Sequence, residues 1–161
     1  IRKTLPEAVI RSTYIVGHPL EDEDDFEDLC SFIEEVHLER SGFFPYSHEE
    51  DTKDYTLAPL DDLLITQRMN ELSVLQDSIS LQWISTLHET SCDALVEIQL
   101  DPKEFQLEAE YLYGGRSFRE APDDDPYLFI ESNTPIALGT RHRVKIYDSI
   151  AYNPLATVLK T

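Results

Sequence analysis

Two cysteines and five histidines are the side chains that could hold a metal ion or act as strong nucleophiles and bases. Cys30 and Cys92 lie far apart and form no CxxC or CxxxCxxC motif, so we expect neither a disulfide framework nor a cysteine-based metal site. No HxxxH or HExxH spacing occurs, which argues against zinc. The neighbours Ser47 and His48 lack the G-x-S-x-G turn of a hydrolase nucleophile. We therefore predict no catalytic or metal-binding residues in this chain. The histidines are His18, His37, His48, His88 and His142.

Carboxylates are the most abundant functional groups. The 161 residues include 32 Asp and Glu against 13 Lys and Arg, for a net charge of −19. The excess extends over both halves, with 19 acidic and 6 basic residues in 1–83 and 13 and 7 in 84–161. Such a chain repels phosphate backbones, so we expect a basic protein rather than nucleic acid as its partner. The alternative interpretation is that the acids only form hydrated, solubilising faces.

A first candidate site is the turn that contains Gly17, Pro19 and Glu21. It follows a predicted strand and precedes a predicted helix, and barrel enzymes bind their ligands at such strand ends. The alternative is structural: Gly17 and Pro19 only shape the turn, and Glu21 is an acid at the positive end of a helix.

A second candidate site begins with Arg116 and Ser117, directly after two glycines, and continues to Asp123, Asp124 and Asp125. The planar guanidinium could contact a protein substrate. Clustered carboxylates suit a basic partner. The alternatives are that Arg116 pairs with one of the three aspartates to fix a long loop, and that the aspartates belong to a hydrated loop.

The elements that position the first site read as a βαβ unit. Residues 9–16 are β-branched and aromatic, which indicates a strand. Apolar residues then recur at helical spacing between 26 and 36, behind an acidic start at 21–25 that suits a capped helix. A second short apolar run at 42–46 completes strand, helix and strand. This order predicts a parallel pair of strands.

The second half follows a different period. Residues 60–88 contain no Gly or Pro and carry leucines at mostly helical spacing, which predicts one long helix or two with a kink. From residue 92 apolar residues alternate with polar ones, which indicates strands at 92–100, 105–113, 127–131, 142–148 and 155–160. Five short strands predict a small antiparallel barrel. We therefore predict three segments: 1–58, 59–88 and 89–161.

The composition also limits where the protein acts. Hydrophobic residues make up 41% of the chain, enough for a packed core. No stretch approaches the ~20 apolar residues of a membrane span, and the chain does not open with a signal peptide. The scarcity of cysteine fits a reducing compartment. We expect a cytoplasmic monomer.

Three stretches resemble one protein family in order and spacing. Residues 11–21, Arg-Ser-Thr-Tyr-Ile-Val-Gly-His-Pro-Leu-Glu, resemble the R-T-T-x-I-V-G-F-P-G-E segment of the radical-SAM methylthiotransferases. Residues 42–50, Gly-Phe-Phe-Pro-Tyr-Ser-His-Glu-Glu, resemble the family's G-x-F-x-Y-S-x-E-E. Residues 115–125, Gly-Arg-Ser-Phe-Arg-Glu-Ala-Pro-Asp-Asp-Asp, are similar to the G-R-S-x-x-[DQ]-A-P-E-x-D segment of the members that modify a ribosomal protein. The last motif is the most specific, and the resemblance covers nearly the whole chain.

The resemblance implies a fold, cofactors and a substrate. Residues 1–58 would be the C-terminal portion of a radical-SAM, TIM-like α/β barrel, 59–88 a connecting helical segment, and 89–161 an all-β, five-stranded antiparallel TRAM barrel that recognises the substrate. The family uses S-adenosylmethionine and two 4Fe-4S clusters to methylthiolate the β-carbon of an aspartate on a basic small-subunit ribosomal protein. By this resemblance, Gly17, Pro19 and Glu21 would bind the cofactor, and Arg116, Ser117 and Asp123 to Asp125 the substrate.

The chain also departs from the family pattern. The cluster cysteines are absent from it, so we predict that this chain alone is an inactive part of a transferase. Leu20 stands at a family glycine, where it could forbid a positive φ or crowd the cofactor. Two alternatives stay open. One is the tRNA-modifying branch, against which the acidic second half counts. The other is a non-catalytic protein-binding module derived from the family.

Overall fold

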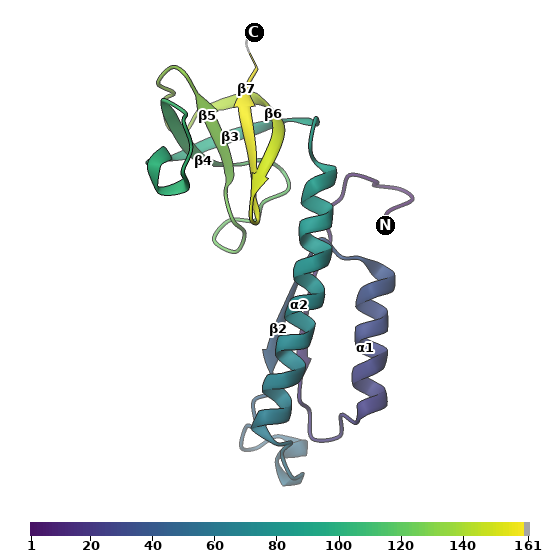
Figure 1. The fold of residues 1–161 in the computed structure, drawn as a ribbon. Helices are drawn as coiled ribbons and strands as arrows, with labels where there is room; N and C mark the ends of the chain where they lie inside the picture. Colours follow the sequence, from purple (N-terminus) through teal and green to yellow (C-terminus); the bar gives the residue numbers. More distant parts are fainter. Residues whose placement is uncertain (160–161) are drawn as a thin grey trace. The chain divides into compact units, whose positions relative to one another are not determined.

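The computed structural model describes residues 1–159 and divides them into two compact units (Figure 1). The first unit is Ile1–Ser80 and the second begins at Leu81. The boundary falls inside helix α2, Asp62–Thr86, which forms as one helix over most of the range predicted to be helical. The division into segments 1–58, 59–88 and 89–161 stays a prediction. Residues 160 and 161, which include the end of the predicted strand 155–160, lie outside the described residues.

The first unit contains the predicted βαβ arrangement. Strands β1 (Arg11–Val16) and β2 (Arg40–Pro45) pair in parallel, and helix α1 (Glu23–Val36) connects them (Figure 1). A short 3-10 helix, η1 (Lys53–Thr56), follows β2. The two strands form a two-stranded sheet, so a closed α/β barrel is not part of the structure of residues 1–159.

Local signals explain where α1 begins and what it covers. Asp22 and Asp25 form a capping box, in which each side chain accepts a hydrogen bond from the other residue's backbone N–H. The helix ends at His37, which adopts a left-handed conformation. Its apolar face packs into the core of the unit against β1 and α2. The fully buried members of this core are Val16, Phe26, Ile33, Leu72 and Ile79.

Buried Glu39 ties the start of the chain to the sheet. Its carboxylate accepts hydrogen bonds from the Arg2 guanidinium and, at 2.8 Å, from the backbone N–H of Ile10. Burial alone would raise the pKa of Glu39, but these donors outweigh it and hold the pKa below its ordinary value. Ionised Glu39 therefore stabilises the first unit above pH ~4.3, its ordinary pKa, and this contribution is lost as the pH falls through the lowered pKa.

We expect Glu39→Gln to lower the free energy of unfolding of the first unit by about 1–2 kcal/mol at pH 7. The difference in free energy of unfolding between this variant and the unsubstituted chain should shrink as the pH falls below ~4. At that pH Glu39 becomes protonated, so it is neutral like the glutamine that replaces it. Urea unfolding between pH 7 and pH 3 measures both. An exposed carboxylate on α1, Glu35→Gln, is the control and should show no such convergence. A gap that stays constant with pH would contradict the prediction.

The second unit is a closed barrel of five strands. These are β3 (Ser91–Leu100), β4 (Tyr111–Arg116), β5 (Leu128–Ser132), β6 (Arg141–Ile150) and β7 (Asn153–Val158), with a short 3-10 helix η2 (Pro102–Phe105) between the first two. Neighbours follow the order β3-β4-β5-β7-β6, and β6 pairs with β3 to close the ring. This is a five-stranded Greek-key barrel.

The prediction of an all-antiparallel barrel is wrong at one pair. Strands β5 and β7 run parallel, with Phe129 opposite Leu155 and Ile130 opposite Ala156, and the other four pairs are antiparallel. The reason is geometric: directions cannot alternate all the way around a closed ring with an odd number of strands. One parallel pair is the minimum, and here it falls where the β6–β7 hairpin meets β5.

Candidate functional site

The loop after β1 forms a tight turn around Gly17. Gly17 has φ +90°, a conformation that side-chain-bearing residues rarely adopt, and a Cβ at this position would come within 2.7 Å of Ile65 Cγ1. The Gly17 N–H donates to Glu21 Oε2 at 2.9 Å, which closes the turn. Leu20 is 66% exposed and is not among the residues with positive φ. The family glycine is therefore replaced here without backbone strain.

Arg68 of α2 stabilises this turn through hydrogen bonds to residues 21–23. Its Nη1 donates to Glu21 Oε1 at 2.6 Å, and its Nη2 donates to the Asp22 carbonyl at 3.1 Å and to Glu23 Oε2 at 3.0 Å. The Arg68 side chain is 4% exposed and that of Glu21 12%, and the guanidinium lies over the Phe26 ring. Both oxygens of Glu21 are thus engaged within the protein. One oxygen holds the backbone of Gly17 and the other holds Arg68, and a role of Glu21 at a cofactor stays a prediction.

Aromatic and imidazole rings gather where β1 and β2 end. His18 follows β1 after Gly17, and its ring lies 5.0 Å from the ring of Tyr46, the residue after β2. The Nε2 of His18 is 3.3 Å from Asp54 Oδ2 of η1. The His48 ring lies 4.9 Å from that of Tyr55. Parallel strands place their carboxyl ends at the same edge, which brings these loops together. Sequence reasoning missed this ring cluster (His18, Tyr46, His48, Tyr55), although His18 and Tyr46 lie within two residues of the ends of the two strands.

In the barrel, Arg116 ends β4 and pairs with Glu97 of β3. Its Nε and Nη2 both lie 2.7 Å from Glu97 Oε2. The hydrogen bond that Arg116 donates to Glu97 is the main reason that the pKa of Arg116 is raised. The structural alternative drawn from the sequence paired Arg116 with Asp123, Asp124 or Asp125. The hydrogen-bonded partner is instead Glu97, while the negative charge of Asp123 also contributes to the raised pKa of Arg116.

The remaining predicted residues lie in the loop 117–127, where two of them form hydrogen bonds within the loop and two are exposed. Ser117 donates both its N–H and its hydroxyl to Glu120 Oε2 at 2.7 Å, and Asp125 accepts from the Ala121 N–H at 2.7 Å, so both hold the loop. Asp123 and Asp124 are exposed, and Asp123 has a left-handed backbone at φ +67°. The carboxylates of Asp123 and Asp124 therefore lie at the surface.

The two cysteines belong to different units. Burial, together with nearby carboxylates such as Glu71, raises the pKa of Cys30. Burial also raises the pKa of Cys92. Two thiols in separate units, each favoured in the protonated form, do not fit an iron–sulfur cluster, which is held by several thiolates. Within residues 1–159, no three His, Cys, Asp or Glu side chains gather as a group that could hold a metal ion.

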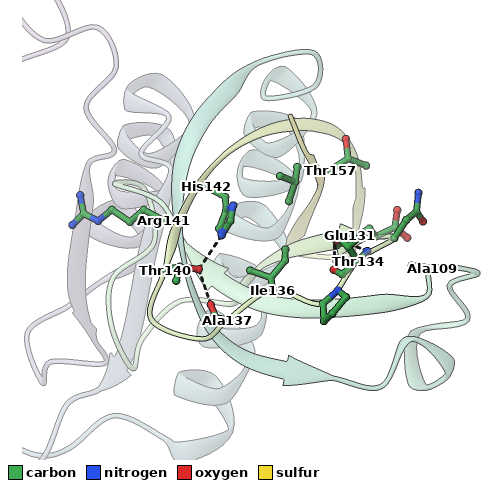
Figure 2. Close-up of a pocket in the computed structure, with 13 residues that line it drawn as sticks. Ala109, Glu131, Thr134, Ile136, Ala137, Thr140, Arg141, His142 and Thr157 are labelled. Carbon is green, nitrogen blue, oxygen red and sulfur yellow. Dashed lines mark hydrogen bonds between the residues drawn. The ribbon is translucent and has the colours of Figure 1, made fainter. Parts of the chain in front are cut away.

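A groove of about 610 Å³ lies along the barrel, away from the predicted residues (Figure 2). It is lined by the ends of β5 and β7, the start of β6 and the loop 133–140 between β5 and β6. The buried Tyr113 holds this loop, because its hydroxyl accepts the N–H of Ile136 at 2.9 Å. The Thr140 hydroxyl donates to the Ala137 carbonyl within the loop and lies 2.9 Å from Nε2 of His142, so it connects the loop to the start of β6 (Figure 2).

None of the helices formed by residues 1–159 combines the length and apolar character that a membrane crossing requires. No family model matches the chain.

Curated proteins do match it, over nearly its whole length. The ribosomal protein uS12 methylthiotransferase RimO of Clostridium botulinum is 33% identical over 159 residues, which cover 98% of this chain and 34% of that protein. The RimO of Clostridioides difficile is 33% identical over 160 residues (99% and 34%), and that of a Sulfurihydrogenibium species 36% over 152 residues (92% and 34%). The chain spans about a third of the length of these curated relatives. Across the third that it spans, the chain belongs to the RimO family of methylthiotransferases.

Proposed function

We propose that this chain is the C-terminal third of a RimO-type methylthiotransferase and that its barrel recognises the protein substrate. The observation that carries the proposal is the match to RimO proteins along nearly the whole chain. The ribosomal-protein type of G-R-S…A-P…D segment at 115–125 supports the same branch. The closed five-stranded barrel is compatible with a TRAM domain, with the mixed pairing described above.

The first unit would then be the end of the radical-SAM barrel. Its parallel strands, connecting helix and ring cluster at the carboxyl edge suit the ligand-binding rim of an α/β barrel. In the family, S-adenosylmethionine supplies a radical and the two 4Fe-4S clusters supply electrons and sulfur. Here Gly17 and Pro19 would shape the cofactor-binding turn, and Glu21 would position it through Arg68. Neither cysteine of this chain suits a cluster, so the ligands would come from other residues of the full-length enzyme.

The barrel would bind the substrate, a basic small-subunit ribosomal protein, through its loop 117–127. Asp123 and Asp124 offer two exposed carboxylates, and Arg116, fixed by Glu97, sits at the base of the loop. The excess of acids in 84–161 favours a basic protein over transfer RNA, because it repels a phosphate backbone.

Calorimetric titration of the chain with ribosomal protein uS12, and in parallel with transfer RNA, tests this function. We expect binding of the protein and none of the RNA. We further expect the double reversal Asp123→Lys/Asp124→Lys to weaken the protein binding about tenfold at low salt, since two contacts become repulsive. Asp125 is left unchanged because it holds the loop.

The matched control reverses two exposed acids on α1, Asp28→Lys/Glu35→Lys, which changes the net charge equally at a different place. Similar weakening by both pairs would mean that overall charge, and not the loop, attracts the partner. Binding of transfer RNA in place of uS12 would instead support the tRNA-modifying branch.

A further inference from the structure

The groove of the barrel has the chemical make-up of a peptide-binding site. Its lining includes the apolar residues Pro135 and Ile136 together with hydroxyl and amide side chains, and Figure 2 shows Ile136 among them. Such a lining covers apolar side chains and also offers donors and acceptors to the backbone of an extended segment. Its volume falls in the range of binding pockets, ~300–1,000 Å³. The hydroxyl and amide residues are Ser132, Asn133, Thr134, Thr140 and Thr157.

The charges around the groove are unevenly placed. Glu131 lines one side, and Ala109, another lining residue, lies between the exposed Glu108 and Glu110. The only guanidinium among the lining residues that the structure describes is that of Arg141, which points away from the others (Figure 2). Among these described lining side chains, Glu131 therefore supplies a carboxylate, and no ammonium or guanidinium group faces it from within the groove.

The Glu131 carboxylate is held in an orientation that allows it to pair with a cationic side chain. The Tyr147 hydroxyl donates to its Oε2 at 2.5 Å, which orients the carboxylate and leaves Oε1 able to accept. Burial, followed by the hydrogen bond to Glu131 and its negative charge, raises the pKa of Tyr147 well above its ordinary value, so Tyr147 stays a donor at neutral pH.

We propose that this groove binds an extended polypeptide segment and that Glu131 receives a lysine or arginine side chain of that segment. The inference deepens the proposed function and rests on it, because it names how a basic protein partner would be held at a second place on the barrel. The groove and the loop 117–127 are separate contacts. On the β4–β5 ladder, Ser132 is opposite Tyr111 at one end, whereas Arg116 and Ser117 follow the other end.

A double-mutant cycle between groove and peptide tests the proposal. The probe is the capped peptide acetyl-Gly-Val-Lys-Val-Ser-Gly-amide, and its partner carries norleucine in place of lysine. Affinities for the full chain and for Glu131→Gln are measured by following backbone amide NMR signals during titration. Glu131→Gln keeps an acceptor for Tyr147, and Glu104→Gln, an exposed glutamate elsewhere in the unit, is the control.

We expect the lysine peptide to bind about tenfold more weakly to Glu131→Gln than to the unsubstituted chain or to Glu104→Gln. The norleucine peptide should bind all three forms equally weakly. The largest shifts should fall on Asn133, Thr134 and Thr157. Equal binding of the two peptides by the unsubstituted chain, shifts confined to loop 117–127, or no binding at millimolar peptide would each overturn the proposal.

The outcome is separable from that of the proposed function. If uS12 binds but the lysine peptide does not, the function stands and the groove inference is wrong. If the peptide binds through Glu131 and uS12 fails to bind, the groove is a peptide site and the proposed function is wrong. Displacement of the peptide by uS12, with Glu131→Gln also weakening uS12, supports both. A short oligonucleotide that displaces the peptide would overturn the protein partner.

Discussion

Replacing Arg68 with methionine is expected to lower the free energy of unfolding of the first unit by about 3–5 kcal/mol. The Arg68 side chain is 4% exposed and neutralises Glu21, whose own side chain is 12% exposed. Methionine fills much of the same space, but it leaves the Glu21 carboxylate buried beside the carbonyl of Asp22 without a cation. Removing one partner of a buried ion pair is costly for this reason, even where the pair as a whole adds little.

Arg68→Met should increase local opening of the turn after β1 before the whole unit unfolds. Glu21 holds the N–H of Gly17, so a displaced carboxylate also frees the turn that follows β1. Hydrogen exchange followed by mass spectrometry measures this, because peptides from 11–22 should exchange faster in Arg68→Met while barrel peptides from 91–116 stay protected. Urea unfolding of the same regions supplies the free energy.

Two further variants distinguish the loss of a buried ion pair from the loss of any arginine. Arg143→Met removes a guanidinium that is 54% exposed and pairs with Asp93 at the surface, so it should cost less than about 1 kcal/mol. The double variant Glu21→Gln/Arg68→Met should recover part of the loss, because no buried charge is left unpaired. The buried-pair explanation fails if Arg68→Met costs no more than Arg143→Met, or if the double variant is as unstable as the sum of its parts.

Period and capping signals in the sequence were sufficient to predict the elements of the first unit. The strand before Gly17, the helix opened by Asp22 and Asp25, and the parallel second strand all form. These signals are local, since each depends on residues within one or two turns of chain.

The strand predicted at 105–113 is wrong over residues 105–110, six of its nine residues. Asp101 accepts the N–H of Lys103, Pro102 starts a 3-10 helix, and β4 begins only at Tyr111. Phe105 and Leu107 alternate with polar residues because they bury against the barrel from a loop, without joining the ladder. Alternation reports burial of every second side chain, which a well-packed loop can achieve as well as a strand.

The ion-pair partners of the candidate-site residues could not be predicted from the sequence, for a different reason. Arg68 is far from Glu21 in the chain, and nothing in the sequence pattern of α2 shows that its single arginine turns inward. Arg116 meets Glu97 across β3 and β4, where the register shifts between Val96 and Ile98. A bulge changes which side chains face each other, and one sequence does not show which pair it aligns.

The close approach of β4 to β3 at Gly115 leads to the second large effect. A Cβ at Gly115 would lie 2.5 Å from the carbonyl oxygen of Leu95 and 2.8 Å from Ile130 Cδ1. Leu95 O is a backbone atom, so it cannot move away without disturbing the β3–β4 pairing, and Ile130 Cδ1 is packed within the barrel core. We expect Gly115→Ala to destabilise the second unit by about 3 kcal/mol, the upper part of the range for overpacked cores.

The neighbouring glycine separates a backbone clash from a side-chain clash. At Gly114 a Cβ would meet Ile98 Cγ2 and Tyr127 Cγ at 2.9 Å, both side-chain atoms that can shift, so Gly114→Ala should cost less than Gly115→Ala. Labelling of the thiol of Cys92, which is 3% exposed in the barrel core, reports unfolding of this unit as urea is raised. Equal midpoints for the two variants would show that β3 yields at Leu95. The bulge next to this position would then be a flexible joint, and Arg116, one residue further along β4, would be held by Glu97 alone and not by the fit of the two strands.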